Sequence, residues 1–192
     1  PKYNTYAATI YNTLAYKGLN LYTEFALKSN DVFYDPYIEK SELIGNNTLG
    51  KLVNASGTVA YVSASYSEGN LGITAEMKRT KNFSFRVDPN LTLLKGIINY
   101  LTPISRQNTY RLTARYTAPA LDISEMAYNL DLRYKFSKAF SANINYSDIK
   151  TLEGKRLYQE IFSEFIYKKD RLWQLTTGLQ LLTYNQEIYE TK

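Results

Sequence analysis

The residues best suited to acid–base chemistry are two glutamates, Glu160 and Glu164, four positions apart. Side chains at this spacing share one face of a strand and lie about 13 Å apart along it, because each residue adds about 3.3 Å. That separation is too large for the carboxylate pair of a retaining glycosidase. The chain contains no His and no Cys, which removes the commonest general base and the thiolate nucleophile. We therefore predict a protein without enzymatic activity.

A group of acidic residues lies in the segment 30–55, which we expect to form a long loop. Its members are Asp31, Asp35, Glu39 and Glu42. Calcium binds oxygen ligands of this kind, and loops often supply them. The spacing matches no EF-hand loop, so an ordinary solvated loop is the favoured interpretation. We predict neither a metal ion nor any other cofactor.

Many of the charged residues alternate with apolar residues along the chain. In a closed barrel, alternate residues face the lumen. The expected lumen-lining residues are Glu24, Lys28, Glu76, Lys78, Arg111, Arg115, Asp131, Arg133 and Lys135. Opposite signs on neighbouring strands predict cross-strand ion pairs that hold the wall together, in preference to selective solute binding. Lysine and arginine are dispersed despite the formal net charge of +5, so no nucleic-acid partner is predicted.

Strands are the elements that position these residues, because apolar residues recur with a period of two. From 128 to 136 one face carries Tyr, Leu, Leu, Tyr and Phe, and the other carries Asn, Asp, Arg and Lys. Comparable segments are 21–28, 71–80, 110–118, 140–147 and 173–183. The alternation is weaker in 5–16, 59–66 and 157–167. A change of phase near Ile10 and Tyr11 predicts a β-bulge in the first of these three.

Short turns and longer connections separate the predicted strands. Turn-forming residues occur at 17–20, 67–70, 137–139 and 168–171. Longer connections are expected at about 30–55, 82–108, 118–125 and 148–156. Short turns at one end and long loops at the other are typical of outer-membrane barrels. Hairpin connectivity requires one more crossing or a non-hairpin connection near 82–125, and the expected total is about nine or ten strands.

Segment 91–107 is the main irregular part of the chain. Its apolar run contains Gly96 and Pro103, and proline cannot donate a hydrogen bond to a sheet ladder. Irregular backbone is not stable in contact with lipid, because its polar groups would lack partners. We therefore expect part of this segment to fold inward near Arg111 and Arg115. A loop packed on the barrel rim and an additional wall strand are the alternatives.

Aromatic residues indicate the environment of the apolar face. The chain contains 19 Tyr and 8 Phe. Rings on the apolar face flank two short turns, with Tyr134, Phe136 and Phe140 at one and Phe165, Tyr167 and Trp173 at the other. Such rings at strand ends are typical of a membrane interface, and strands of about 9–11 residues match a tilted bilayer crossing. The mean hydropathy of −0.38 is compatible with this interpretation, because barrel strands alternate polar and apolar residues.

Three stretches carry a resemblance to a known family: residues 77–86 (MKRTKNFSFR), 98–103 (INYLTP) and 106–110 (RQNTY). They resemble the uncharacterised outer-membrane β-barrel proteins of the Bacteroidota, a family known as a domain of unknown function. The resemblance is strongest over 77–136, and family members often carry His where this chain has Asn108. It implies a membrane barrel and members longer than this chain, and it brings no assigned activity.

We therefore expect an all-β fold, an antiparallel transmembrane β-barrel. Residues 1–192 are expected to form a single segment of meandering hairpins, as a fragment or part of a larger barrel. The expected location is the bacterial outer membrane, and the expected partners are membrane lipid and other outer-membrane or periplasmic proteins. The expected role is a non-enzymatic, porin-like channel or a structural component of an envelope assembly. The alternative is a soluble β-sheet binding module, followed by a membrane-embedded enzyme.

Overall fold

The chain forms one antiparallel sheet of eight strands in sequence order, each hydrogen-bonded to the next. The computed structural model describes residues 4–40, 48–83, 104–105, 124–169 and 172–189. The strands are β1 (Ala7–Tyr16), β2 (Leu19–Lys40), β3 (Thr48–Glu68), β4 (Leu71–Lys81), β5 (Glu125–Lys135), β6 (Phe140–Thr151), β7 (Arg156–Lys169) and β8 (Trp173–Tyr184). One helical turn, α1 (Gln186–Tyr189), follows β8. No helix in the described residues has the length and apolar character needed to cross a membrane.

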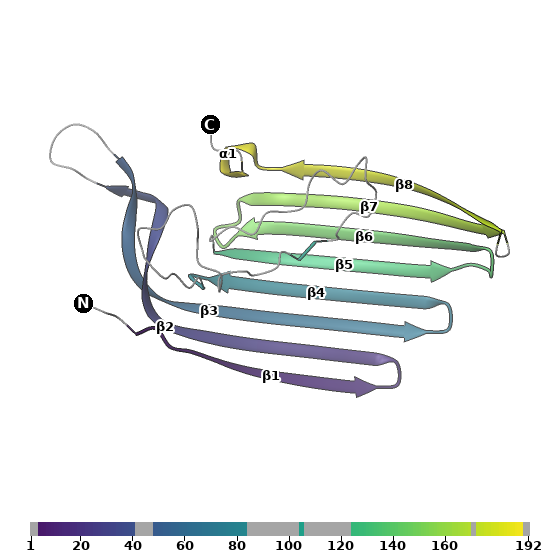
Figure 1. Cartoon of the computed structure of the whole chain (residues 1–192), viewed down its shortest axis with the longest axis horizontal. Helices are drawn as coiled ribbons and strands as arrows, with labels where there is room; N and C mark the ends of the chain where they lie inside the picture. Colours follow the sequence, from purple (N-terminus) through teal and green to yellow (C-terminus); the bar gives the residue numbers. More distant parts are fainter. Residues whose placement is uncertain (1–3, 41–47, 84–103, 106–123, 170–171, 190–192) are drawn as a thin grey trace.

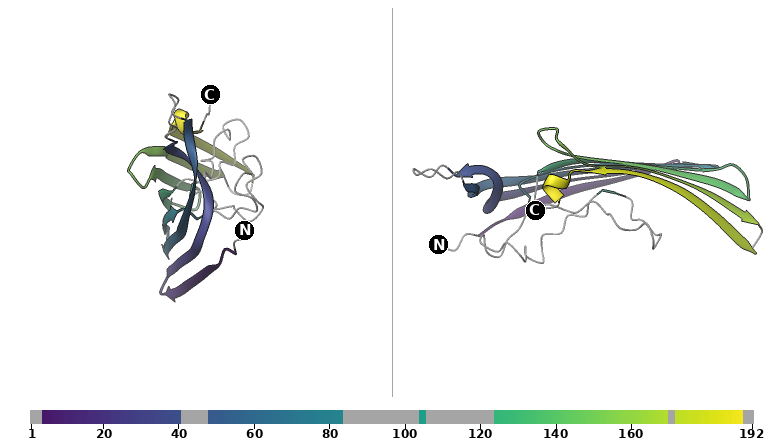
Figure 2. Two further views of the ribbon diagram at one scale, coloured as in Figure 1. Left: turned by 90° about the vertical axis from the view of Figure 1, so that its left-hand side faces the viewer. Right: turned by 90° about the horizontal axis from the view of Figure 1, so that it is seen from above.

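The sheet is a single curved layer with β1 at one edge and β8 at the other (Figures 1 and 2). The predicted all-β antiparallel fold is confirmed. In the described part of the chain the sheet is not closed into a barrel, because β1 and β8 do not pair with each other. The described residues contain eight strands, against the nine or ten that the sequence predicted.

The pairing of β4 with β5 settles how the sheet continues across the irregular middle of the chain. These two strands are direct antiparallel neighbours, in register from Leu71 opposite Tyr134 to Thr80 opposite Glu125. No strand separates them in the sheet, so the connectivity needs no further crossing. The predicted strand 110–118 and the crossing considered within 91–101 lie outside the described residues.

Tight turns join the strands at one end of the sheet, on the right in Figure 1. The β1–β2 turn has Lys17 at φ 42° and Gly18 at φ 80°, and two positive φ values match the right-handed twist of the flanking strands. In the β5–β6 turn, the Ser137 hydroxyl accepts hydrogen bonds from the backbone N–H groups of Ala139 and Phe140 at 3.2 and 3.1 Å. The predicted turns at 17–20, 67–70 and 137–139 are therefore confirmed.

Three local predictions were wrong. Most of segment 30–55 is strand, because β2 and β3 continue as a long paired arm beyond the other strands (Figure 1). The connection expected at 148–156 is shorter, since β6 runs to Thr151 and β7 begins at Arg156. The register of β1 is continuous through Ile10 and Tyr11, and the irregularities lie instead between β2 and β3 and between β6 and β7. Tyr11 stacks on Tyr22 across the strands, which explains an aromatic residue among polar neighbours without a bulge.

The register gives the sheet two chemically different faces. Directly opposed residues of paired strands lie on the same face. We call the face that contains Glu24, Tyr61 and Lys78 the polar face, because these three residues are aligned across β2, β3 and β4. We call the face that contains Leu130 and Ile144 the apolar face. The polar face holds most of the buried residues, whereas the large side chains of the apolar face are largely exposed.

A small hydrophobic cluster covers one end of the polar face, away from the tight turns. Its buried members are Ile104, Ala127, Ile149, Leu157 and Tyr158. Ile104 belongs to none of the strands, and only 7% of its surface is exposed. Ile104 therefore packs on the polar face at this end of the sheet. The remainder of segment 91–107 except Ser105, and likewise Arg111 and Arg115, lies outside the described residues, so the expected inward fold stays a prediction.

Candidate functional site

The polar face gathers the charged residues that the sequence singled out. Pairing partners show that Glu24 and Lys28 of β2, Glu76 and Lys78 of β4, and Asp131, Arg133 and Lys135 of β5 share this face. The strand alternation positions them, because every second residue of these strands points to one side. Arg111 and Arg115 lie outside the described residues. Whether the face lines a lumen stays a prediction.

Two glutamates near the middle of this face are held by neutral hydrogen-bond donors. Glu24 accepts hydrogen bonds from the hydroxyls of Thr9 at 3.0 Å and Tyr22 at 2.7 Å. Glu76 accepts one from the Tyr61 hydroxyl at 2.5 Å and one from the Asn129 amide at 2.9 Å. Hydrogen bonds of this kind to a carboxylate are strong, so they hold the Glu24 and Glu76 side chains in fixed positions on the face.

The chain of hydrogen bonds continues from Asn129 into β6. The Asn129 side-chain oxygen accepts from the Asn145 amide and from the Ser147 hydroxyl, both at 3.0 Å. Asn145 and Ser147 are buried, with 2% and 0% of their surface exposed. Polar groups removed from water need such partners, since an unpaired one costs about 1–3 kcal/mol. Tyr61, Glu76, Asn129, Asn145 and Ser147 therefore form one network that crosses β3 to β6.

Glu160 of β7 repeats this arrangement on the C-terminal side of the sheet. It accepts hydrogen bonds from the Tyr158 hydroxyl at 2.8 Å and from the Gln180 amide. Glu164 lies on the same face, and both glutamates are buried. The predicted placement of Glu160 and Glu164 on one strand face is confirmed, and their four-residue spacing on a strand keeps the carboxylates apart.

Two lysines of the polar face form ion pairs near the end away from the tight turns. Lys78 lies 3.1 Å from Glu125, with 6% and 7% of the two side chains exposed. Lys28 lies 3.3 Å from Asp31, with 0% and 14% exposed. The Lys78–Glu125 pair joins β4 to β5, as the expected cross-strand ion pairs require. Removing one partner of a buried pair leaves an uncompensated charge, which is strongly destabilising.

The acidic group considered for calcium does not form a site in the described residues. Asp31 pairs with Lys28 and accepts a hydrogen bond from the backbone N–H of Val32 at 2.8 Å. Asp35 and Glu39 lie within β2, and Glu42 is outside the described residues. The described part of the chain contains no cluster of three or more acidic residues arranged to hold a metal ion.

The apolar face carries exposed large side chains on β1, β2 and β5 to β8. Its exposed large side chains include Ile10 and Leu14 on β1, Phe25 and Leu27 on β2, Tyr128, Leu130 and Tyr134 on β5, Ile144 on β6, Ile161 and Phe165 on β7, and Leu175, Leu179 and Leu181 on β8. A soluble protein seldom exposes a contiguous apolar patch larger than a few hundred Å². The exposed side of this sheet is thus unusually rich in large apolar side chains.

Aromatic rings follow the apolar face along the tight-turn end. Ring centroids are 4.8 Å apart for Tyr134 and Phe136, 5.3 Å for Phe136 and Phe140, and 6.4 Å for Phe140 and Phe165. Tyr167 and Trp173 add an edge-on pair at 5.5 Å across β7 and β8. These distances are those of favourable aromatic pairs. The aromatic residues that flank two turns in the sequence therefore form rows in space.

Tyrosine–glutamate pairing is the feature that sequence reasoning missed. Tyr22 and Glu24, and likewise Tyr158 and Glu160, are two residues apart, so that each hydroxyl meets the carboxylate on its own face of one strand. Tyr66 and Glu68 repeat the pairing at the end of β3. The recurrent Tyr-x-Glu spacing was a usable signal in the sequence. The Tyr61–Glu76 contact was not, because only the β3–β4 register brings these residues together.

Comparison with known proteins gives a family without an assigned activity. Neither the curated proteins nor the solved structures contain a significant match to the chain. One family model matches residues 2–189, nearly the whole chain. Its description is a family of unknown function, which agrees with the resemblance to a domain of unknown function and does not extend to source or location. The chain belongs to this family of unknown function (DUF6029).

Proposed function

We propose that this chain forms part of the wall of a bacterial outer-membrane β-barrel, of the kind found in Bacteroidota, in which the apolar face contacts lipid and the polar face lines the interior. Its role is non-enzymatic, as a channel or as a structural component of an envelope assembly. The observation that carries the proposal is the distribution of burial: the hydrogen-bonded polar residues are inside and the large apolar residues outside. A soluble sheet would show the opposite distribution.

Dimensions of the strands support this proposal. β1 has 10 residues, β4 and β5 have 11, and β6 and β8 have 12. A tilted strand needs about 9–11 residues to cross the hydrocarbon core. The aromatic rows at the tight-turn end fit the girdle that marks a membrane interface. In outer-membrane barrels the short turns face the periplasm, which assigns this end of the sheet to the periplasmic side.

The single tryptophan provides a direct test. Trp173 begins β8 on the apolar face beside Tyr167, and 49% of its surface is exposed. We expect its fluorescence to be quenched by phosphatidylcholine brominated near the headgroup when the protein is folded into vesicles. Moving the probe to mid-strand, as Trp173→Phe/Leu130→Trp, should shift the strongest quenching to bromines deep in the acyl chains, because Leu130 lies in the centre of β5 on the same face.

A matched probe on the other face makes the test specific. In Trp173→Phe/Ser65→Trp the indole replaces a small residue of the polar face, beside an open cavity of about 380 Å³ that Ser63 and Tyr22 also line. This probe should escape the brominated lipids. Equal quenching of Leu130→Trp and Ser65→Trp, or none for either, would overturn the proposed orientation.

A soluble β-sheet binding module is the second candidate, and one observation favours it. Neither β1 nor β8 has a second neighbour in the described part of the chain, so their outer backbone edges are open to a further strand. Extended peptides bind such edges by strand addition. This function predicts a protein that stays monodisperse without detergent and lacks lipid quenching of Trp173, so the same fluorescence experiment separates the two candidates.

A further inference from the structure

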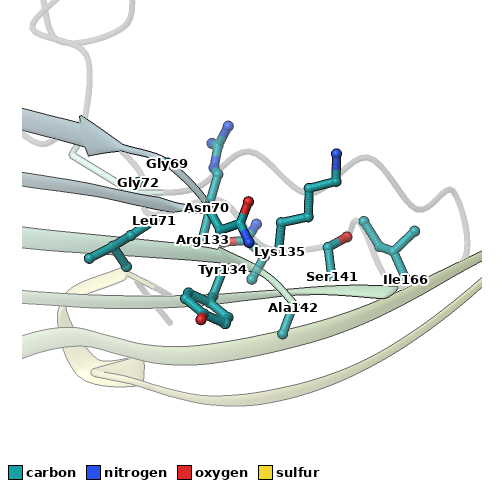
Figure 3. A pocket seen from close by; sticks show the side chains of 11 residues that line it. Gly69, Asn70, Leu71, Gly72, Arg133, Tyr134, Lys135, Ser141, Ala142 and Ile166 are labelled. Carbon is teal, nitrogen blue, oxygen red and sulfur yellow. The ribbon is translucent and has the colours of Figure 1, made fainter. Parts of the chain in front are cut away.

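An open cavity of about 470 Å³ lies at the tight-turn end of the polar face. Its walls come from the β3–β4 turn and from β4, β5, β6 and β7. Figure 3 shows the side chains of Arg133, Lys135 and Ser141 extending to one side of the sheet there, whereas Leu71 and Tyr134 extend to the other. The cavity thus belongs to the polar face and is distinct from the network around Glu76.

The two cationic side chains of this cavity, Arg133 and Lys135, have donor groups without a hydrogen-bond partner in the described residues. Arg133 uses its Nε to bind Asp131 at 2.6 Å, and 72% of its side chain is exposed. Its two terminal guanidinium nitrogens have no partner within the described residues. Lys135 is likewise without a hydrogen-bond or ion-pair partner for its ammonium group in the part of the chain that the structure describes.

Neutral groups complete the lining. Ser141 lies opposite Lys135 in the β5–β6 register, and Asn70 lies in the turn beside it, where its carbonyl accepts from the Lys135 backbone N–H at 2.9 Å. Their side chains add a hydroxyl and an amide donor. Gly72 leaves one wall without a side chain. No carboxylate is among the described lining residues, and Asp131, outside the lining, occupies only the Nε of Arg133.

We propose that this cavity binds an oxyanion, a phosphate or carboxylate group carried by a small solute or by a lipid headgroup. The planar guanidinium of Arg133 suits two oxygens of such a group, and the Lys135 ammonium supplies a mobile second charge. Hydrogen bonds from Ser141 and Asn70 fix its orientation. The inference rests on the cavity alone, and it holds whether the sheet is a barrel wall or a soluble module.

Phosphate binding to the full chain tests this proposal. Equilibrium dialysis with radiolabelled inorganic phosphate, on protein refolded in zwitterionic detergent, should show saturable binding. Lys135→Gln and Arg133→Gln should each weaken it about tenfold, since each removes a charge-assisted hydrogen bond. Lys135→Arg keeps the positive charge and should bind phosphate about as well as the unsubstituted protein. Lys138→Gln removes the same charge from the exposed β5–β6 turn, outside the cavity, and should change the affinity less than about twofold.

The outcomes are distinct. Absence of saturable phosphate binding by the folded protein, or equal losses in Lys138→Gln and Lys135→Gln, would overturn the proposal, the second because binding would then follow overall charge. Circular dichroism of each variant verifies that it is folded. Repeating the measurement in vesicles with and without phosphatidylglycerol identifies the source of the oxyanion: a Lys135-dependent competition assigns the site to a lipid headgroup, and an unchanged affinity assigns it to a soluble solute.

Discussion

The two faces of this sheet are made by the same strands with the same alternation, yet they differ in burial and in hydrogen bonding. On the polar face, Glu76 and Glu160 are enclosed by tyrosine and amide donors, and Lys78 is buried against Glu125. On the apolar face, Leu130 and Leu179 are exposed and have no polar group to satisfy. Alternation along the strands separates polar from apolar residues onto two faces, whereas the surroundings of the sheet determine which of the two faces is buried.

The stability of the polar face depends on each hydrogen-bond and ion-pair partner. The stability of the apolar face depends on the medium that surrounds it. A buried polar network is stable only when its members are satisfied, because the low dielectric that strengthens each bond also raises the cost of a missing one. Exposed apolar side chains gain or lose free energy with the medium they contact. Substitutions on the two faces should therefore differ in size and in their dependence on lipid.

The largest effect is expected for Lys78→Met, which leaves Glu125 buried without its cation. The free energy of unfolding should fall by about 3–5 kcal/mol. Urea unfolding of the protein folded in phosphatidylcholine vesicles measures it. The double variant Lys78→Met/Glu125→Leu should recover most of the loss, since the Glu125 carboxylate is then no longer buried without its cation. Lys155→Met breaks the exposed pair with Glu187 and should cost no more than about 0.5 kcal/mol. Equal costs for the two single variants would contradict the buried pairing.

Charges placed on the apolar face are expected to have the next largest effect. Leu179→Arg and Leu130→Arg should each lower the free energy of unfolding in vesicles by about 2–4 kcal/mol if the sites lie near the bilayer midplane, because lipid solvates a charge poorly. Ser65→Arg, on the polar face beside an open cavity, is the matched control and should be tolerated. Comparable losses of unfolding free energy in Leu130→Arg and Ser65→Arg would contradict the assignment of different surroundings to the two faces.

Asn129 is unsuitable as that control, although its polar neighbours in the sequence suggest tolerance. Its amide donates to Glu76 and its oxygen accepts from Asn145 and Ser147. We expect Asn129→Arg to destabilise the protein through the loss of these bonds, so its effect would report the network and not the lipid.

Removal of one tyrosine hydroxyl tests the network at smaller scale. Tyr61→Phe leaves Glu76 without its closest donor and should lower the free energy of unfolding by about 1.5–3 kcal/mol, the range for hydrogen bonds to charged groups. Tyr128→Phe removes a hydroxyl that has no hydrogen bond in the described structure and lies on the apolar face. Its effect should stay within about 0.5 kcal/mol. Similar values for both would show that the Tyr61 hydroxyl is not specifically bound.

The smallest effect is expected from the aromatic row. Phe136 contacts both Tyr134 and Phe140, so Phe136→Leu should cost about 0.5–1.5 kcal/mol beyond the change in buried area. A double-mutant cycle with Phe140→Leu isolates the contribution of the ring pair. Phe25→Leu, an exposed ring of the same face without an aromatic neighbour in the described residues, provides the comparison. Additive effects in the cycle would show that the contact between these two rings does not contribute to the stability of the sheet.

Local patterns predicted most of the strands and failed where pairing overrides them. The alternation from Tyr128 to Phe136 fixed both faces of β5, and Lys17-Gly18 fixed the first hairpin. The sequence predicts a long loop over 30–55, and the acidic residues there have a low intrinsic preference for strands. The structure pairs it as β2 with β3, where ladder hydrogen bonds between two long strands outweigh the propensities of Asp31 and Asp35.

The all-β antiparallel class, the tight turns and the separation of charged from apolar residues could be predicted from the amino-acid sequence, because these features depend on neighbours within a few positions. The tertiary structure was needed to show that β4 pairs with β5 and that Glu76 accepts hydrogen bonds from both Tyr61 and Asn129. Asn129 is 53 positions from Glu76 in the chain. Contacts at that separation follow from strand order and register, which no local pattern encodes.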